Sequence, residues 1–205
     1  MAIATIGLDL VKPEFPMVGY NERFKEVKRR TLRRHEILRI FQRLSPCLVG
    51  IEQCSGSHYW GRQLLEFGHE VKVIPAHYVK LRNPEKGFFE DARVLAAAVT
   101  QNDIPEVPIK SIDQLEIHSI HRMHIQCLRD RTSVCNLTWQ LLTEHGITLP
   151  KSVRAMRRFL PGLLENSAND FGKRLNRILE HRLKQLIELD DHLKFYETEI
   201  AKFHH

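Results

Sequence analysis

The sequence contains no long apolar run. Its longest uninterrupted apolar stretch is the six residues from Val94 to Val99, whereas a helix that spans a membrane needs about 20. The first residues also lack a cationic region ahead of their apolar stretch, and Asp9 interrupts that stretch, which is unlike a secretory signal. We therefore expect a cytoplasmic protein that has no membrane partner.

Cysteine is scarce, and the four cysteines form no C-x-x-C pair, so we expect free thiols and no disulfide framework. Three histidines and a cysteine do recur at every third residue, at His118, His121, His124 and Cys127. On a helix this spacing drifts around the surface and does not converge on one point, so a zinc site would need ligands from elsewhere. The other interpretation is ordinary histidines on a helix surface.

Acidic residues are few in one segment, from Glu22 to Arg43. The 205-residue chain has 31 Lys and Arg against 25 Asp and Glu, a formal charge of +6. This basic segment holds nine basic and three acidic residues and so carries the whole excess. Concentrated positive charge attracts phosphates by releasing counterions, although a solvated surface strand and helix is the alternative. We predict that five of its residues contact nucleic acid: Lys28, Arg29, Arg30, Arg33 and Arg34.

Residues 1–110 alternate between strand and helix patterns. The expected strands and helices are, in order, Ala2–Leu10, Phe15–Tyr20 and Phe24–Thr31 as strands, Leu32–Leu44 as a helix, Cys47–Ile51 as a strand, Ser57–Phe67 as a helix, Glu70–Pro75 as a strand and Phe88–Thr100 as a helix. The order βββαβαβα predicts an α/β domain whose first three strands form an antiparallel meander and whose last two are reached by crossovers.

Residues 111–205 have a helical pattern, and residues 113–145 contain no glycine or proline. Two apolar stripes alternate three- and four-residue steps, the first through Ile120, Met123, Cys127, Asp130, Val134, Leu137 and Leu141, the second through Leu175, Leu179, Arg182, Leu186, Leu189, Leu193, Tyr196, Ile200 and Phe203. This spacing is typical of coiled coils. It predicts two helices, each roughly 50 Å long, that pair within the chain as a hairpin or with a second copy in a homodimer or higher oligomer.

A second basic cluster lies between the two long helices. Lys151, Arg154, Arg157 and Arg158 share one face of a helix, and no acidic residue occurs between Glu144 and Glu165. These four side chains are further candidates for nucleic-acid contacts. A solvated connector helix is the alternative.

Two carboxylates interrupt apolar strands near their ends. Asp9 occurs in IGLDL and Glu52 in LVGIEQ, and both are costly to bury without a partner. Adjacent strand ends would bring the pair together, and hard oxygen ligands of this kind bind Mg²⁺. The alternative is structural, with Asp9 capping a turn and Glu52 pairing with a basic neighbour.

These motifs resemble a known family. IGLDLVK, LVGIEQCSGSHYWGRQ and DARVLAAAV, in this order and spacing, are similar to the amino-terminal half of the DEDD transposases of bacterial insertion sequences, the group of the Piv and MooV invertases. The resemblance implies a ribonuclease-H-like (RuvC-like) domain at residues 1–110 and a helical coiled-coil region at residues 111–205. It also implies DNA transposition and recombination by Mg²⁺-dependent phosphodiester chemistry, DNA as partner and a guide RNA.

The resemblance carries the first, second and last acids of the family's tetrad onto Asp9, Glu52 and Asp91, as catalytic residues and metal ligands. The third acid normally stands one helical turn before the last, and Phe88 occupies that position here. Neither Glu85 nor Glu90 has the spacing to replace it. We therefore expect weakened metal affinity and impaired cleavage.

Intact members also have a carboxy-terminal domain with a catalytic serine, and the sequence ends at His205 before that domain. The leading hypothesis is an insertion-sequence transposase whose activity is impaired. The alternatives are a non-catalytic module for nucleic-acid binding and dimerisation, and a RuvC-like nuclease that cuts DNA junctions.

Overall fold

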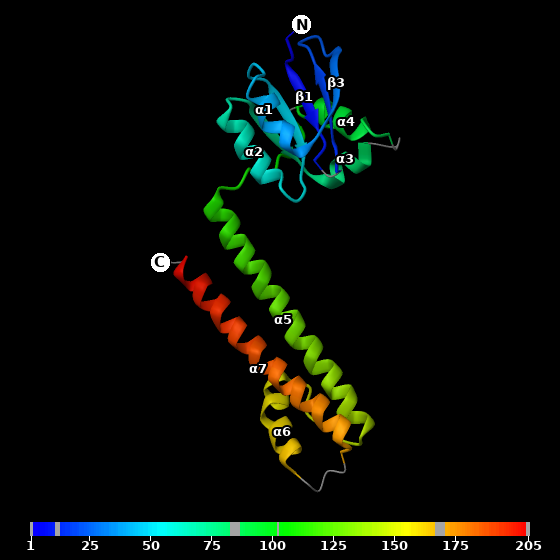
Figure 1. The fold of residues 1–205 in the computed structure, drawn as a ribbon, viewed down its shortest axis with the longest axis vertical. Helices are drawn as coiled ribbons and strands as arrows, with labels where there is room; N and C mark the ends of the chain where they lie inside the picture. Colours follow the sequence, from blue (N-terminus) through cyan, green and yellow to red (C-terminus); the bar gives the residue numbers. More distant parts are fainter. Residues whose placement is uncertain (1, 11–12, 83–86, 102, 167–170, 204–205) are drawn as a thin grey trace. The chain divides into compact units, whose positions relative to one another are not determined.

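The computed structural model describes residues 2–10, 13–82, 87–101, 103–166 and 171–203. The chain divides into two compact units, Met1–Ser111 and Ile112–His205, which are drawn in Figure 1. None of the helices in the described part of the chain is long and apolar enough to cross a membrane.

The first unit is built on a five-stranded mixed sheet. Its strands are β1 (Thr5–Leu8), β2 (Phe15–Tyr20), β3 (Glu26–Leu32), β4 (Leu48–Glu52) and β5 (Glu70–Ile74). The strand order across the sheet is β3-β2-β1-β4-β5. β1 pairs antiparallel with β2 and parallel with β4, and β4 pairs parallel with β5. The α/β class expected from the sequence is thus confirmed.

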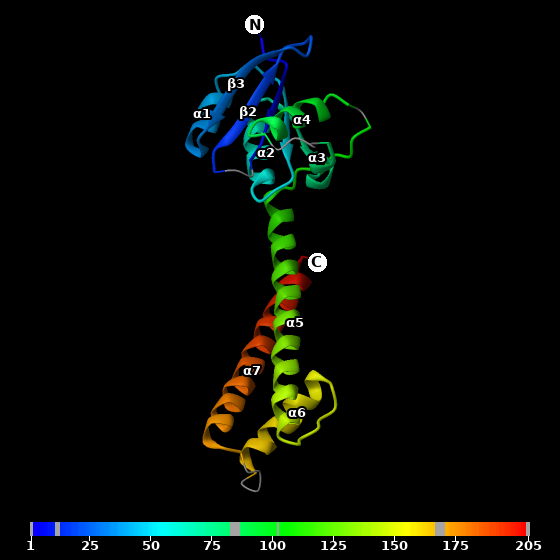
Figure 2. The same cartoon turned by 90° about the vertical axis from the view of Figure 1, so that its right-hand side faces the viewer.

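Helices cover both faces of this sheet. They are the 3₁₀ turn η1 (Arg34–Glu36), α1 (Ile37–Phe41), α2 (Ser57–Glu66), α3 (Ala76–Arg82) and α4 (Glu90–Ala98). α1 and α2 pack on one face, and α3 and α4 lie on the other (Figures 1 and 2). α3 was not predicted from the sequence, since this short segment has no repeated apolar stripe. The first helix was also predicted to begin too early, because Leu32 stays in β3 and a 3₁₀ turn precedes α1.

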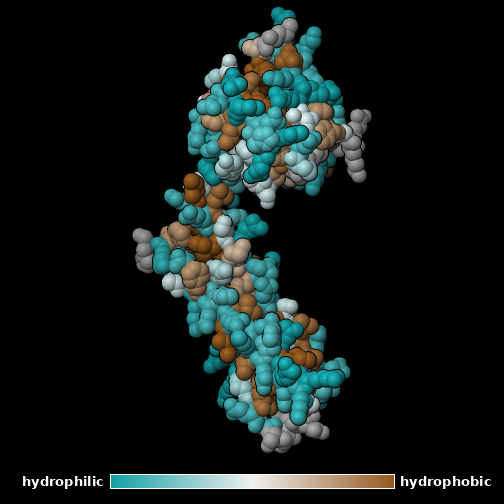
Figure 3. All heavy atoms as spheres, in the orientation of Figure 1, coloured by the Kyte–Doolittle hydropathy of each residue, from teal (hydrophilic) through white to brown (hydrophobic). Residues whose placement is uncertain are grey.

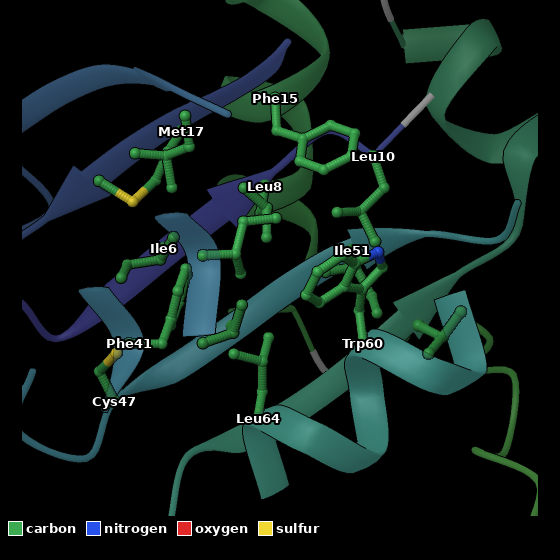
Figure 4. Packing of buried hydrophobic residues seen from close by; sticks show 14 residues of the cluster. Ile6, Leu8, Leu10, Phe15, Met17, Phe41, Cys47, Ile51, Trp60 and Leu64 are labelled. Atoms are coloured by element: carbon green, nitrogen blue, oxygen red, sulfur yellow. The ribbon is translucent and has the colours of Figure 1, made fainter. Parts of the chain in front are cut away.

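The largest apolar cluster lies between the sheet and the pair α1 and α2. Ile6 and Leu8 of β1 point into it together with Ile51 of β4, and they meet Trp60 and Leu64 of α2 (Figure 4). Successive side chains of a strand point to opposite faces of the sheet. The alternate residues therefore face α4. They are Gly7 and Asp9 at β1, and Gly50 and Glu52 of β4.

Two glycines let α4 approach the sheet closely. Gly7 of β1 and Gly50 of β4 are register partners in neighbouring strands. A Cβ atom on Gly7 would lie 1.7 Å from the carbonyl oxygen of Ala92, and one on Gly50 would lie 2.7 Å from the carbonyl oxygen of Leu95. Because these contacts are with backbone atoms, no rotamer change relieves them. The backbone of α4 rests directly on this glycine pair.

The second unit consists of three helices, α5 (Ile112–Glu144), α6 (Val153–Glu165) and α7 (Lys173–Lys202). α5 and α7 run antiparallel along each other, and α6 packs beside both (Figure 2). α6 continues past Pro161, which lies inside the helix. Leu160 before this proline is fully buried, and Leu163 and Leu164 after it pack against the same core, so the apolar contacts span the proline.

The buried face of α5 differs from the predicted stripe. Met123 and Leu137 are 52% and 44% exposed, whereas Cys135, Thr138 and Leu142 are buried. Thr138 can occupy the core because its hydroxyl donates to the carbonyl of Val134, at 2.8 Å. The α7 stripe is closer to the prediction, since Leu175, Leu179, Leu186 and Leu193 are all buried.

Candidate active site and nucleic-acid interface

Asp9 and Glu52 lie side by side at the carboxyl ends of two parallel strands. Asp9 directly follows β1, Glu52 is the last residue of β4, and the preceding residues Leu8 and Ile51 are register partners. The backbone N–H of Asp9 donates to the carbonyl of Pro16 at 3.0 Å, which extends the β1–β2 pairing to this position. Both carboxylates are buried, at 1% and 7% exposure. By strand alternation both point toward the α4 face.

The charges of both carboxylates affect the pKa of the nearby Cys54 thiol. Burial raises the pKa of Cys54 to about 11, and the negative charges of Glu52 and Asp9 act in the same direction. Cys54 therefore stays protonated at neutral pH and is not a nucleophile. The same holds for Cys47, whose pKa burial raises to about 11.

Asp91 lies in the first turn of α4, the helix that packs on β1 and β4. It is half-buried and precedes Ala92, whose carbonyl lies above Gly7. The three predicted site residues thus come from β1, β4 and α4. Across the described residues, however, no three or more His, Cys, Asp or Glu side chains group closely enough to hold a metal ion. A metal site formed by all three carboxylates remains a prediction.

Phe88 lies in the turn that leads into α4. Its side chain is 44% exposed, and its ring meets that of Phe89 edge to face with centroids 5.1 Å apart. Glu90 forms an ion pair with Arg93 at 2.6 Å, so it is engaged elsewhere and does not stand in for an acid at Phe88. Glu85 lies outside the described residues.

The basic segment does not form a single surface. In the β2–β3 pairing, Val18 is the partner of Arg29 and Met17 is the partner of Arg30. Val18 packs under α4, and Met17 belongs to the core under α1 and α2. Arg29 therefore lies on the α4 face, while Arg30 and, by alternation, Lys28 lie on the opposite face. The predicted contact residues of β3 are therefore divided between the two faces of the sheet, because a strand alternates its side chains.

Several of these basic side chains already have partners. Arg29 pairs with Glu26 at 2.7 Å, and Arg30 with Glu36 at 3.0 Å. Arg34 lies over the ring of Trp60, 5.1 Å from its centroid, and Arg33 is exposed on the loop between them. Partially exposed ion pairs contribute little to stability, so these guanidinium groups can still contact a polyanion.

The second basic cluster is also divided. Lys151, Arg154 and Arg158 are exposed, but Arg157 donates to Asp190 of α7. Arg131 of α5 donates to the other carboxylate oxygen of Asp190 at 2.9 Å. Arg157 therefore links α6 to α7, and the other three side chains remain available on the surface.

The glycine pair beneath α4 was not predicted, although the sequence contains a repeated pattern that indicates it. Both strands carry glycine two residues before the acid, as GLD at residues 7–9 and GIE at residues 50–52. Since alternate residues share a face, this repeated pattern places each glycine and its acid on the same side. The glycine admits the helix, and the acid lies beside it.

The chain is similar in sequence to several curated proteins. No protein-family model matches it. A curated protein of Pseudomonas aeruginosa named "Probable family 20 transposase" is 36% identical over 156 residues, which are 76% of this chain and 46% of that protein. The transposase for insertion sequence element IS1328 of Yersinia enterocolitica is 26% identical over 157 residues, 76% of this chain and 47% of that protein.

A third relative, the transposase for insertion sequence element IS1111A of Coxiella burnetii, is 25% identical over 199 residues, 97% of this chain and 55% of that protein. The chain spans about half the length of these curated relatives. By this similarity it is related to transposases, two of which are named for insertion sequence elements.

Proposed function

We propose that this chain acts in DNA transposition as part of an insertion-sequence transposase of the DEDD type. Its first unit is a ribonuclease-H-like domain for Mg²⁺-dependent phosphodiester chemistry, and its second is a coiled-coil hairpin that contributes to self-association. Asp9, Glu52 and Asp91 are the catalytic acids. The observation that carries this proposal is the burial of Asp9 and Glu52 side by side at the ends of β1 and β4.

The two buried carboxylates fit a hard divalent cation. Mg²⁺ takes oxygen ligands and keeps several waters, so two protein ligands can suffice to hold it. Asp9 and Glu52 would supply them, with Asp91 as a further ligand from α4. Bound Mg²⁺ would stabilise the negative charge that develops on the phosphate oxygens. The protein's own contribution is to hold these acids in fixed positions and to bind the DNA backbone nearby.

In this proposal Phe88 occupies the position of a metal-binding acid and so lowers the affinity for Mg²⁺. An acid introduced at this position should raise that affinity. Phe88→Asp adds a carboxylate one helical turn before Asp91, so we expect Mg²⁺ to bind several-fold more tightly. Titration calorimetry of the full chain measures this. Phe195→Asp, at a similarly exposed phenylalanine of α7 (58% exposed), should leave Mg²⁺ affinity unchanged. Equal affinities for the wild type and Phe88→Asp would contradict the assignment of the four acid positions.

The proposed contact with DNA predicts a salt-dependent interaction through the basic segment. Neutralising Lys28 and Arg33 together should weaken duplex binding and reduce the slope of log K against log salt by about 2, roughly one for each lost phosphate contact. Fluorescence anisotropy at several salt concentrations measures the slope. The matched control neutralises Lys184 and Lys194 of α7, which are 77% and 71% exposed. If both double variants lower the slope equally, the attraction is general and not located at the basic segment.

A non-catalytic module for nucleic-acid binding is the second candidate function. It is favoured by Phe88 at the position of an acid and by the absence of any metal-holding group of three side chains among the residues described. The same binding assay separates the two candidates when it is combined with a nicking assay. Salt-dependent binding without Mg²⁺-dependent nicking, in the wild type and in Phe88→Asp alike, would favour the second candidate.

A further inference from the structure

The hairpin between β2 and β3 presents an exposed aromatic ring. Phe24 lies at its tip with a φ of 54° and is the single non-glycine residue with positive φ in the described part of the chain. Its side chain is 43% exposed. A bulky residue rarely adopts this backbone conformation, and such strained positions are concentrated at binding and catalytic sites. Glycine would satisfy the turn with less strain, so the turn alone does not account for phenylalanine.

Local contacts hold the tip in place. The side-chain oxygen of Asn21 accepts from the backbone N–H groups of Arg23 and Lys25, at 3.1 and 3.0 Å. The backbone N–H of Phe24 donates to the carbonyl of Asn21 at 2.9 Å. The ring of Phe24 is stacked on that of Tyr20, with centroids 4.4 Å apart and planes 6° from parallel. The aromatic side chain is thus preorganised, with Tyr20 covering one ring face.

Charged residues flank Phe24 in the sequence of the turn. Arg23 and Lys25 flank Phe24 in sequence, and both are exposed, as is Glu22. An apolar peptide or a second protein core would have to desolvate these charges without apolar neighbours to compensate. A nucleobase has an apolar face to stack and phosphates on both sides to meet cations. The combination of one flat ring with a cation on each side fits that chemistry.

We propose that Phe24 is a stacking platform for an unpaired nucleobase of a single-stranded nucleic acid. The base lies on the ring of Phe24 and extends the Tyr20–Phe24 stack by one layer, while Arg23 and Lys25 contact the flanking phosphates. Paired bases are excluded because their faces are covered by neighbouring pairs. This inference rests on the proposed function in that it assumes nucleic-acid binding, and it adds the strandedness of the ligand and the residue that reads it.

Phe24→Gly tests the platform without damaging the turn. We expect its affinity for a single-stranded oligonucleotide to fall roughly 5- to 150-fold, the usual cost of losing one stacked base, and its affinity for a duplex of the same sequence to stay within about twofold. The melting temperature should change little, because the ease with which glycine adopts positive φ offsets the loss of the stack on Tyr20. Tyr59→Ala, at a 42% exposed aromatic side chain of α2, is the matched control and should change neither affinity.

A second variant makes the stacking visible. Phe24→Trp keeps an aromatic ring, so single-strand affinity should be retained and the fluorescence of the new indole should be quenched when the strand binds. DNA and RNA single strands of one sequence are titrated in parallel, and whichever binds more tightly identifies the source of the base.

The outcomes separate this proposal from the proposed function. Unchanged single-strand affinity in Phe24→Gly, with duplex binding intact, overturns the platform alone. Equal losses for single strands and duplexes overturn it too, because they indicate a general contact. If the wild-type chain binds neither, both the platform and the proposed nucleic-acid function are wrong.

Discussion

Replacing Gly7 with alanine is expected to destabilise the first unit by at least ~3 kcal/mol, which is at the upper end for overpacking a core. The added Cβ would lie 1.7 Å from the carbonyl oxygen of Ala92 and 2.7 Å from the backbone nitrogen of Ala96. The strand or α4 must therefore move. Because α4 carries Asp91 and packs on the strands that hold Asp9 and Glu52, the same shift should weaken the Mg²⁺ binding that we propose for these acids.

Urea unfolding followed by tryptophan fluorescence measures this loss. The chain has two tryptophans, Trp60 in the first unit and Trp139 in the second, so a Trp139→Phe background leaves Trp60 as the reporter of the first unit. Gly19→Ala in β2 is the matched control, since its Cβ would meet side-chain atoms and no backbone, those of Ile3 at 3.3 and 3.5 Å and the Cβ of Lys28 at 3.5 Å. We expect it to cost less than about 1 kcal/mol. Comparable losses in the two variants would show that α4 does not rest on the glycine pair.

The contrast between Gly7 and Asp9 illustrates which parts of the site were predictable. A charged residue at the end of an apolar strand is conspicuous, so the placement of Asp9 and Glu52 at adjacent strand ends was predicted from the sequence. Glycine occurs inside strands for many reasons. Gly7 is required here because α4, a helix more than 80 residues later in the chain, packs directly on it. Local sequence does not encode such a distant contact, although the repeated glycine two residues before each acid could have suggested it.

For the basic segment, the sequence predicted the amount of charge but not the face of the sheet on which each charged side chain lies. Composition revealed its excess charge correctly, but a count of charges carries no direction. Arg29 and Arg30 point to opposite faces because they are consecutive residues of β3. From the sequence, Phe24 was assigned to this strand. It belongs instead to the turn before the strand, where its ring is exposed. A phenylalanine with positive φ is difficult to predict from the sequence because bulky residues rarely adopt that conformation.

In the helical unit, the predicted α5 stripe had Asp130 as its one polar member. Arg131 and Thr138 take part in the buried face instead, and Met123 and Leu137 remain outside it. Figure 3 shows apolar surface interspersed with hydrophilic residues along this unit. An ion pair can replace an apolar contact only where its partner lies on another helix, here Asp190 of α7, and this pairing is not visible in either stripe alone.

Asp190→Asn is accordingly expected to destabilise the helical unit by about 2–3 kcal/mol. Asp190 is 8% exposed and binds Arg131 of α5 and Arg157 of α6, so its carboxylate joins all three helices. Removing one partner of a buried pair costs about 3–5 kcal/mol. We reduce this figure because the side chains of Arg131 and Arg157 are 27% and 45% exposed and therefore partly solvated.

Urea unfolding in a Trp60→Phe background, where Trp139 of α5 reports on the helical unit, measures the loss. The matched control is Asp191→Asn, since Asp191 is 66% exposed and pairs with a 71% exposed Lys194, and it should change stability by less than about 0.5 kcal/mol. A triple variant with Asp190→Leu, Arg131→Met and Arg157→Met removes every charge of the cluster together. Apolar replacement of a whole buried ionic cluster is often neutral or stabilising, so the triple variant should recover most of the stability that Asp190→Asn loses. If Asp190→Asn costs no more than the control, the three helices are held by their apolar contacts, and the cluster contributes only to their register.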